Sequence, residues 1–174
     1  SAICNGQTGI LLLAGGQGSR LGFEKCKGMF PIETPSNLTL FLRILFNRQQ
    51  IQTIAQKYKH TTDRVHIPFI ILTSELTSND VTTYFNTLYQ IAKLNKDSSS
   101  NESSVLQTIT TDKILQSCSD LITFDLLRDI IFIQQGSYPA FSLDGKIIIS
   151  EDMLYLSPNG NGGAINALLP TLQH

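Results

Sequence analysis

The sequence predicts an α/β fold in which a mainly parallel sheet is covered by helices on both faces. Three short apolar runs, at 9–14, 67–72 and 130–133, are continuous rather than alternating, which is typical of strands buried on both sides. Between these runs lie two segments whose apolar residues recur every three or four positions, the spacing of a helix with one apolar face. The order strand, helix, strand, helix, strand favours parallel pairing in a doubly wound layout.

The two helices are expected to pack one face each against the sheet. The predicted apolar face of the first helix consists of Leu40, Phe41, Ile44, Leu45, Arg48, Ile51, Ile54, Ala55 and Tyr58. The second helix is expected to begin near 78–80, because serine, asparagine and aspartate there suit an N-cap. Its predicted inward-facing residues are Val81, Tyr84, Phe85, Leu88 and Ile91.

The remaining chain is predicted to hold a loop, a helical segment and a hairpin. The stretch 97–104 is polar and rich in serine, so it cannot bury enough area to offset its ordering entropy and is expected to be a mobile surface loop. Helical spacing resumes over 105–127. A hairpin turn is expected at 144–145, ahead of an extended segment at 146–149. The glycine-rich turn at 159–163 then leads into a last helix.

Length, charge and cysteine content limit the class of protein. The 174 residues fit one domain. A net charge of −1 offers no global field for nucleic acid or an anionic membrane, so neither partner is expected and any anion site must be local. No apolar run reaches the roughly 18 residues of a membrane span, and the start of the chain lacks the pattern of a signal peptide. The three cysteines fit neither a disulfide framework nor a metal motif. We therefore expect a cytoplasmic protein.

A glycine-rich loop at 15–22 follows the first predicted strand directly, at the edge of the sheet where α/β proteins bind ligands. Glycines let successive backbone N–H groups converge on a phosphate or a base edge. The loop contains neither a P-loop string nor a complete dinucleotide fingerprint, which argues against a dinucleotide-dependent oxidoreductase. Instead it carries Arg20, with Lys25 and Lys27 close behind. An arginine fork and a lysine charge on one polyanion suit phosphoryl or nucleotidyl transfer.

Five blocks of sequence, in order along the chain, carry a more specific signature than the loop alone. They are Leu13–Gly22 with Lys27–Met29, Thr73–Ser74 with Thr77 and Phe85, Phe132–Gly136 with Pro139–Ala140, Asp144–Ile147, and Ser157–Gly163. Together these blocks resemble the eukaryotic UDP-sugar pyrophosphorylase family, and within it most closely the branch that makes UDP-N-acetylglucosamine.

The resemblance implies a Rossmann-like nucleotidyltransferase core that makes UDP-N-acetylglucosamine and pyrophosphate from UTP and N-acetylglucosamine 1-phosphate with Mg²⁺. In the implied site, Leu13, Ala14, Gly15 and Gly16 line the uridine and phosphate region, Arg20 and Lys27 hold the triphosphate as catalytic residues, Gln135 and Gly160 contact the uracil part, and Asn161 contacts the sugar. The amide of Gln135 suits a uracil edge because it offers both a donor and an acceptor.

The chain departs from the family at several points. Cys26 stands where the family has proline, and Asn159 where it has aspartate. The segment at about 90–121 has no clear counterpart and is expected to be an insertion. Because the family enzymes are several hundred residues long, residues 1–174 are expected to form a partial nucleotidyltransferase domain that carries the UTP-binding part, with little or no turnover alone. No acidic residue can be assigned as the Mg²⁺ ligand, which is expected beyond residue 174.

Two other functions stay open at this point. The first is a pyrophosphorylase for UDP-glucose or UDP-galactose, because sugar specificity in the family depends largely on residues beyond 174. The second is a non-catalytic nucleotide-binding module, which the missing acidic ligand favours.

Overall fold

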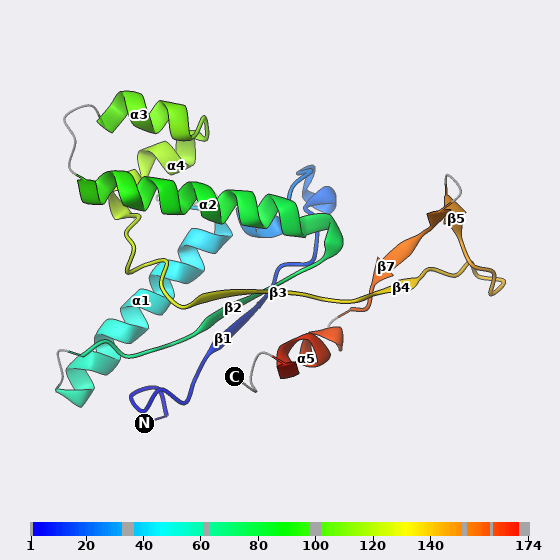
Figure 1. Cartoon of the computed structure of the whole chain (residues 1–174), viewed down its shortest axis with the longest axis horizontal. Coiled ribbons are helices and arrows are strands. Elements are labelled where there is room, and N and C mark those ends of the chain that lie inside the picture. The colour runs from blue at the N-terminus through cyan, green and yellow to red at the C-terminus, as the bar shows by residue number, and fades with distance from the viewer. Residues whose placement is uncertain are drawn as a thin grey trace.

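The centre of the structure is a parallel sheet of three strands (Figure 1). The strands are β1 (Ile10–Leu13), β2 (Phe69–Thr73) and β3 (Ile130–Gln134), in the order β1-β2-β3. The computed structural model describes residues 2–32, 37–60, 63–97, 102–150, 153–160 and 162–170. The predicted α/β class and parallel pairing are confirmed.

Helices lie on both faces of this sheet, as the sequence predicts. Helix α1 (Leu40–Lys59) joins β1 to β2 and α2 (Glu75–Asp97) joins β2 to β3. Both pack against the same face of the sheet, and in Figure 1 α2 lies above the strands and α1 to their left. Neighbouring parallel strands joined in sequence by right-handed crossovers place both connecting helices on one face. Helix α5 (Gly163–Leu168) lies below the sheet and contacts β3. No helix within the described residues has the length and apolarity that crossing a membrane requires.

The main hydrophobic core fills the space between the sheet and the two long helices. Its buried members include Phe41, Leu42 and Leu45 of α1, Phe69 and Ile71 of β2, and Val81, Phe85, Leu88 and Ile91 of α2. Every predicted inward-facing residue of the second helix is buried. This core fixes the carboxyl ends of the strands relative to the start of α1.

The prediction that all three apolar runs are buried on both sides is wrong for two of them. Strand β2 is buried along its whole length, whereas Leu11 and Leu13 of β1 and Ile131 of β3 are exposed. These residues lie on the sheet face opposite α1 and α2, and β1 and β3 are the edges of the described sheet. Within the described residues, the central strand alone is therefore covered on both sides.

Helix α1 begins at its capping residue Thr39, whose Oγ1 accepts the N–H of Leu42 at 3.3 Å. Of the predicted apolar face, Phe41, Leu45, Arg48 and Ala55 are buried, but the prediction is wrong for Leu40 at the start of the helix and for three residues toward its end. Ile51 and Ile54 are exposed there, and Tyr58 is 79% exposed. This end of the helix extends past the main core and meets the N-terminal segment around Ile3 instead.

Helix α2 begins at Glu75, ahead of the predicted start at 78–80. The turn at Ser74 already forms helical hydrogen bonds, because its carbonyl oxygen accepts the N–H groups of Thr77 and Ser78 at 3.1 and 2.9 Å. The N–H of Ser74 in turn donates to Thr77 Oγ1 at 3.1 Å. The chain therefore turns from strand to helix directly at the end of β2.

The predicted surface loop at 97–104 is wrong at both ends. Asp97 is the last residue of α2, and α3 (Glu102–Ile109) begins where the loop was expected to continue; residues 98–101 lie outside the described ranges. Helix α3 is stabilised because its later residues Leu106 and Ile109 pack against the core. The helical spacing predicted over 105–127 is confirmed as far as Leu121, by α3, by α4 (Lys113–Ser117) and by a 3-10 turn at Ser119–Leu121, but it is wrong for 122–127, which form no helix.

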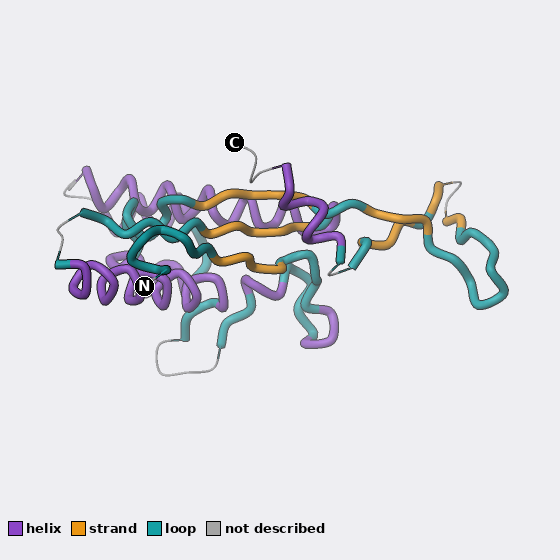
Figure 2. The backbone as a smooth tube through the Cα atoms, turned by 90° about the horizontal axis from the view of Figure 1, so that it is seen from below, coloured by secondary structure: helices purple, strands orange, loops and turns teal. Residues whose placement is uncertain are grey.

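A β arm projects from the carboxyl end of the sheet, and Figure 2 shows it extending away from the helices. Its short antiparallel strands are β4 (Ser137–Pro139) paired with β7 (Leu156–Pro158), and β5 (Ile149–Ser150) paired with β6 (Met153–Leu154). The predicted turn is confirmed, with φ of 81° at Gly145. The extended segment predicted over 146–149 forms a strand only from Ile149.

Candidate functional site

A cavity of about 460 Å³ lies at the carboxyl end of the sheet. It is lined by Leu12, Leu13, Ala14, Gly15, Gly16, Lys27, Gly28, Leu40, Phe41, Gln135, Pro158 and Gly160. The lining residues come from the end of β1, the following loop, the start of α1, the end of β3 and the base of the β arm. Segments far apart in the sequence thus converge at the sheet edge where ligands bind in α/β folds.

Most residues that the sequence suggested for a nucleotide site line this one cavity. They are Leu13, Ala14, Gly15, Gly16, Lys27, Gln135 and Gly160. Arg20 does not line the cavity: it is exposed on a 3-10 turn at Ser19–Leu21. Asn161 lies outside the described residues. Sequence reasoning missed Gly28 and Phe41, although the Lys-Gly-Met block could have drawn attention to Gly28.

The glycine loop folds back on itself, which brings Lys27 beside Gly16. The N–H of Gly18 donates to Lys25 O at 2.9 Å, and the N–H of Lys27 donates to Gly16 O at 3.2 Å. A bridge between Gln17 and Cys26 closes the same loop. Lys27 is the single ionisable side chain among the described residues that line the cavity, so the local charge there is positive.

Gln135 lies against the first glycine of the loop. Its backbone N–H donates to Thr73 O at 2.9 Å, which continues the pairing of β2 with β3. A Cβ built on Gly15 would lie 2.7 Å from Gln135 Nε2, so glycine is needed there to admit the glutamine side chain. Gln135 is 9% exposed, and its side-chain amide bonds to no other described residue. The amide can therefore bind a ligand in the cavity.

Two further glycines allow close packing around the site. A side chain on Gly28 would overlap the ring of Phe41, and one on Gly163 would overlap the amide of Asn159. The N–H of Asn159 donates to Gly136 O at 3.0 Å, so this residue connects the segment after β3 to the turn before α5. The Oδ1 atom of Asn159 is buried without a hydrogen-bond partner in the described chain.

Cys26 is buried beneath the loop. Its Sγ donates to Ala14 O at 3.3 Å. Burial raises the pKa of the Cys26 thiol, and the nearby carboxylate of Asp80 adds to the rise. The thiol therefore stays protonated at neutral pH and acts as a weak hydrogen-bond donor rather than as a nucleophile.

The described residues of the cavity do not fit a magnesium site. Mg²⁺ prefers carboxylate oxygens with near-octahedral geometry, and none of the described residues that line the cavity is aspartate or glutamate. Across the described ranges, no group of at least three histidine, cysteine, aspartate or glutamate residues comes together to hold a metal.

A larger cavity of about 630 Å³ lies at the other end of α1, against the N-terminal segment. It is lined by Ile3, Cys4, Asn5, Ile51, Ile54, Ala55, Tyr58 and Lys59. Half of these lining residues are aliphatic, and Lys59 has no glycine loop and no strand end beside it among the described residues of the lining. The chemistry of this cavity therefore suits an anionic nucleotide less well than that of the smaller cavity does.

A comparison with protein-family models assigns the chain to a family. The model described as UTP–glucose-1-phosphate uridylyltransferase matches residues 3–117. The chain belongs to this family. The matched range includes β1, the glycine loop, α1, β2 and α2, and with them the cavity-lining residues from Leu12 to Phe41. Gln135, Pro158 and Gly160 of the lining lie outside it.

The curated relatives are named for N-acetylglucosamine, whereas the description of the family model names glucose 1-phosphate. The chain is 32% identical to UDP-N-acetylglucosamine pyrophosphorylase of Saccharomyces cerevisiae, an alignment that covers 96% of this chain and 28% of the yeast protein. It is 29% identical to the probable UDP-N-acetylglucosamine pyrophosphorylase of Schizosaccharomyces pombe, over 96% of this chain and 29% of that protein. The chain thus spans less than a third of the length of these relatives.

Solved structures of the same kind share the fold. A putative UDP-N-acetylglucosamine pyrophosphorylase from Entamoeba histolytica matches with a TM-score of 0.68 at 27% identity, over 98% of this chain and 34% of that one. The corresponding enzyme from Trypanosoma brucei matches with a TM-score of 0.67 at 24% identity, over 96% of this chain and 26% of that one. The predicted Rossmann-like nucleotidyltransferase core agrees with these matches.

Proposed function

We propose that this chain is the UTP-binding part of a uridylyltransferase that forms UDP-N-acetylglucosamine and pyrophosphate from UTP and N-acetylglucosamine 1-phosphate. The observation that carries the proposal is the convergence of Gly15, Gly16, Lys27 and Gln135 on one cavity at the carboxyl end of the sheet. The relatives' names supply the nucleotide and the sugar.

Each of these residues has a role that follows from its chemistry. Gln135 would contact the uracil edge, because its amide is beside Gly15 and has both a donor and an acceptor to offer. Lys27 would hold the phosphates as a compact cation. During in-line attack by the sugar phosphate on the α-phosphorus, negative charge develops on the departing pyrophosphate, and a positioned cation stabilises that charge.

Arg20 would hold the outer phosphates from the loop. It is exposed outside the cavity lining, so in this proposal it reaches the end of a bound triphosphate rather than its base. In the full-length enzyme we expect Arg20→Ala to lower turnover at least about tenfold, equivalent to about 1.4 kcal/mol of transition-state stabilisation. Steady-state pyrophosphate release measures this, and unchanged turnover would remove Arg20 from the catalytic set.

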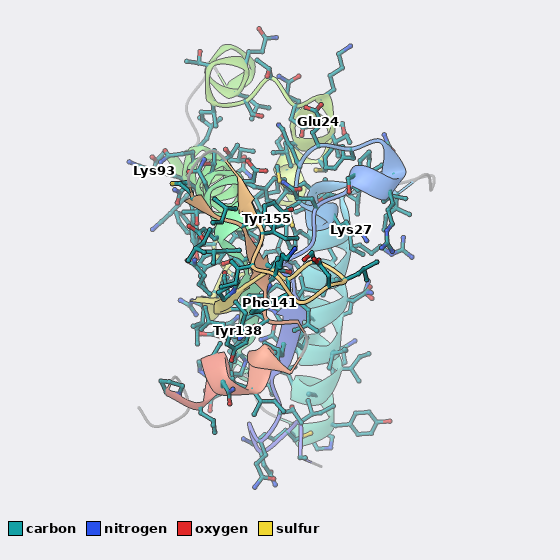
Figure 3. All side chains as sticks on the ribbon, turned by 90° about the vertical axis from the view of Figure 1, so that its right-hand side faces the viewer. Glu24, Lys27, Lys93, Tyr138, Phe141 and Tyr155 are labelled. Atoms are coloured by element: carbon teal, nitrogen blue, oxygen red, sulfur yellow. The ribbon has the colours of Figure 1, made fainter. Side chains whose placement is uncertain are left out.

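Titration calorimetry of UTP against the chain and its Lys27→Ala variant tests the proposed nucleotide site. We expect the variant to bind UTP at least about tenfold more weakly, because one charge-assisted contact to phosphate is lost. Lys93→Ala is the matched control, since Lys93 is exposed on α2 and lies on the other side of the molecule from Lys27 (Figure 3). Equal losses in both variants, or no UTP binding by the wild type, would contradict the proposal.

The description of the family model favours glucose 1-phosphate as a second candidate for the sugar substrate. Offering a panel of sugar 1-phosphates to the longest natural form of the protein separates the two candidates. UTP binding without pyrophosphate exchange in that form would instead favour a non-catalytic nucleotide-binding module. Magnesium remains part of the proposal, with its carboxylate ligand expected outside this chain.

A further inference from the structure

Two hydroxyl groups at the start of α2 hold the first residues of the glycine loop. Thr77 Oγ1 donates to Ala14 O at 2.9 Å, and Ser74 Oγ donates to Gly15 O at 2.8 Å. Both side chains are buried, with 0% of Thr77 and 1% of Ser74 exposed. The contacts join residues about sixty positions apart in the sequence and cross from the end of β2 to the end of β1.

These hydroxyl groups do more than cap the helix. Thr77 Oγ1 accepts the N–H of Ser74 at 3.1 Å, which is a local capping contact. Its own proton, and that of Ser74, are directed to the neighbouring strand end instead. The two hydroxyl oxygens also lie within hydrogen-bond distance of each other, at 3.2 Å. Their contacts with the carbonyl oxygens are shorter, so each hydroxyl fixes one carbonyl of the loop.

Fixing a carbonyl also fixes the next amide. The peptide bond is planar and trans, so the C=O of one residue and the N–H of the next point in opposite directions. No peptide bond in the described chain is cis. The N–H groups of Gly15 and Gly16 therefore point away from Thr77 and Ser74, and neither donates to another described residue. Both glycines line the cavity.

We propose that Ser74 and Thr77 are positioning residues that hold the amides of Gly15 and Gly16 for oxygen atoms of the nucleotide. The inference rests on the proposed function and adds a division of roles. Gly15, whose amide is held through Thr77, lies beside the Gln135 side chain, and this amide serves a uracil oxygen. The amide of Gly16, held through Ser74, belongs to the residue whose carbonyl accepts the N–H of Lys27, and it serves a phosphate oxygen.

If the two amides serve different parts of the nucleotide, variants of Thr77 and Ser74 should differ in how strongly they weaken the binding of UTP and of uridine. Titrating the chain with each ligand measures both affinities. Thr77→Val removes a hydroxyl with little change in shape and is expected to weaken both ligands about fivefold to tenfold, the effect of one hydrogen bond. Ser74→Ala is expected to weaken UTP about fivefold to tenfold and to change uridine binding less than twofold. Thr77→Ser keeps the hydroxyl and is expected to restore wild-type affinity.

Thr82→Val is the matched control, because Thr82 is exposed on the same helix. UTP affinities of Thr77→Val and Ser74→Ala within twofold of the wild type would overturn the inference while leaving the proposed function intact. Absence of UTP binding by the wild type would contradict the proposed function and, with it, this inference. If Thr77→Val fails to fold, Ser74→Ala decides, because it removes a single oxygen atom from the side chain.

Discussion

Gly15 is the residue at which packing and the proposed function meet most directly. A Cβ there would lie 2.7 Å from Nε2 of Gln135, the amide proposed to contact uracil. We expect Gly15→Ala to weaken UTP binding at least about tenfold, because the displaced glutamine loses its alignment with the base.

Gly162→Ala is the control for that experiment, since a Cβ at Gly162 has nothing within 4 Å. Titration calorimetry gives the affinities, and thermal unfolding checks that both variants fold. A Gly15→Ala variant with wild-type affinity would show that Gln135 does not contact the nucleotide.

Cys118 predicts how stability depends on pH. Burial, with a contribution from Asp112, raises the pKa of this thiol to about 11 in the folded chain, whereas an unfolded thiol ionises near 8.5. The folded state therefore holds its proton more tightly, so the stabilisation is complete below about pH 8.5 and is lost as pH rises toward 11. We expect about 1–2 kcal/mol of this contribution to be lost by pH 10.

Urea unfolding at pH 8 and pH 10 measures the loss. Cys118→Ala has no thiol to ionise, so its stability should fall less between the two pH values than that of the wild type. An identical fall in both proteins would assign the pH dependence to other groups.

At the residue scale, the sequence predicted the roles of side chains whose signal lies in the neighbouring residues. It missed those whose partners are far away along the chain. The glycine loop and Lys27 follow from a strand end, a run of glycines and a spaced cation. Gln135 came from the family resemblance, because a glutamine after an apolar run has no meaning by itself. Ser74 and Thr77 stood in one of the five blocks without a predicted role, since nothing in their local sequence reveals carbonyl partners about sixty residues earlier.

At the element scale, α1 is attached to the segment before β3 by a buried arginine. Arg48 has 0% of its surface exposed and donates to the carbonyls of Leu126 and Arg128 at 2.6 and 2.8 Å. Its guanidinium carbon also lies 5.5 Å from the centre of the Phe69 ring. Burial lowers the pKa of Arg48, but an arginine remains charged at neutral pH.

Arg48→Met should lower the free energy of unfolding by about 2–4 kcal/mol, because two buried carbonyls lose their charged donor. Urea denaturation measures this as a lower midpoint with little change in slope. Arg43→Met is the control, since Arg43 is exposed on the same helix. Equal midpoints for the two variants would contradict the role assigned to Arg48.

Helix and strand types were predictable from periodicity, and their limits were less so. Apolar spacing predicted α1 throughout, yet Ile51, Ile54 and Tyr58 are exposed because the core ends before the helix does. The start of α2 was placed too late because Ser74 caps it from the end of β2. Composition alone predicted a loop over 97–104, but contacts of Leu106 and Ile109 stabilise α3.

At the scale of the whole molecule, the described chain leaves apolar surface uncovered. Figure 3 looks at the end that carries the β arm, where Tyr138, Phe141 and Tyr155 are exposed. Leu143, Ile149 and Met153 of the same arm are exposed as well. Monomeric proteins rarely expose large contiguous apolar patches. The chain spans less than a third of its curated relatives, so further chain is available in those proteins to cover such surface.

We expect the 174-residue chain alone to self-associate with increasing concentration through this arm. Replacing Leu143 with serine and Ile149 with threonine should reduce association and leave the midpoint of urea unfolding unchanged, because both side chains are already exposed. Sedimentation velocity measures the association. A monomer at every concentration, or equal association of wild type and variant, would contradict the expectation.

The central claim is that the cavity at the carboxyl end of the sheet is the UTP site. A residue-resolved NMR titration of ¹⁵N-labelled chain with UTP tests it most directly, because it reports on both cavities at once. We predict the largest amide shift changes at Gly15, Gly16, Gln135 and Gly160, saturating with UTP concentration. Changes confined to the apolar cavity around Ile3, Ile51 and Ile54, or no changes at all, would contradict the claim.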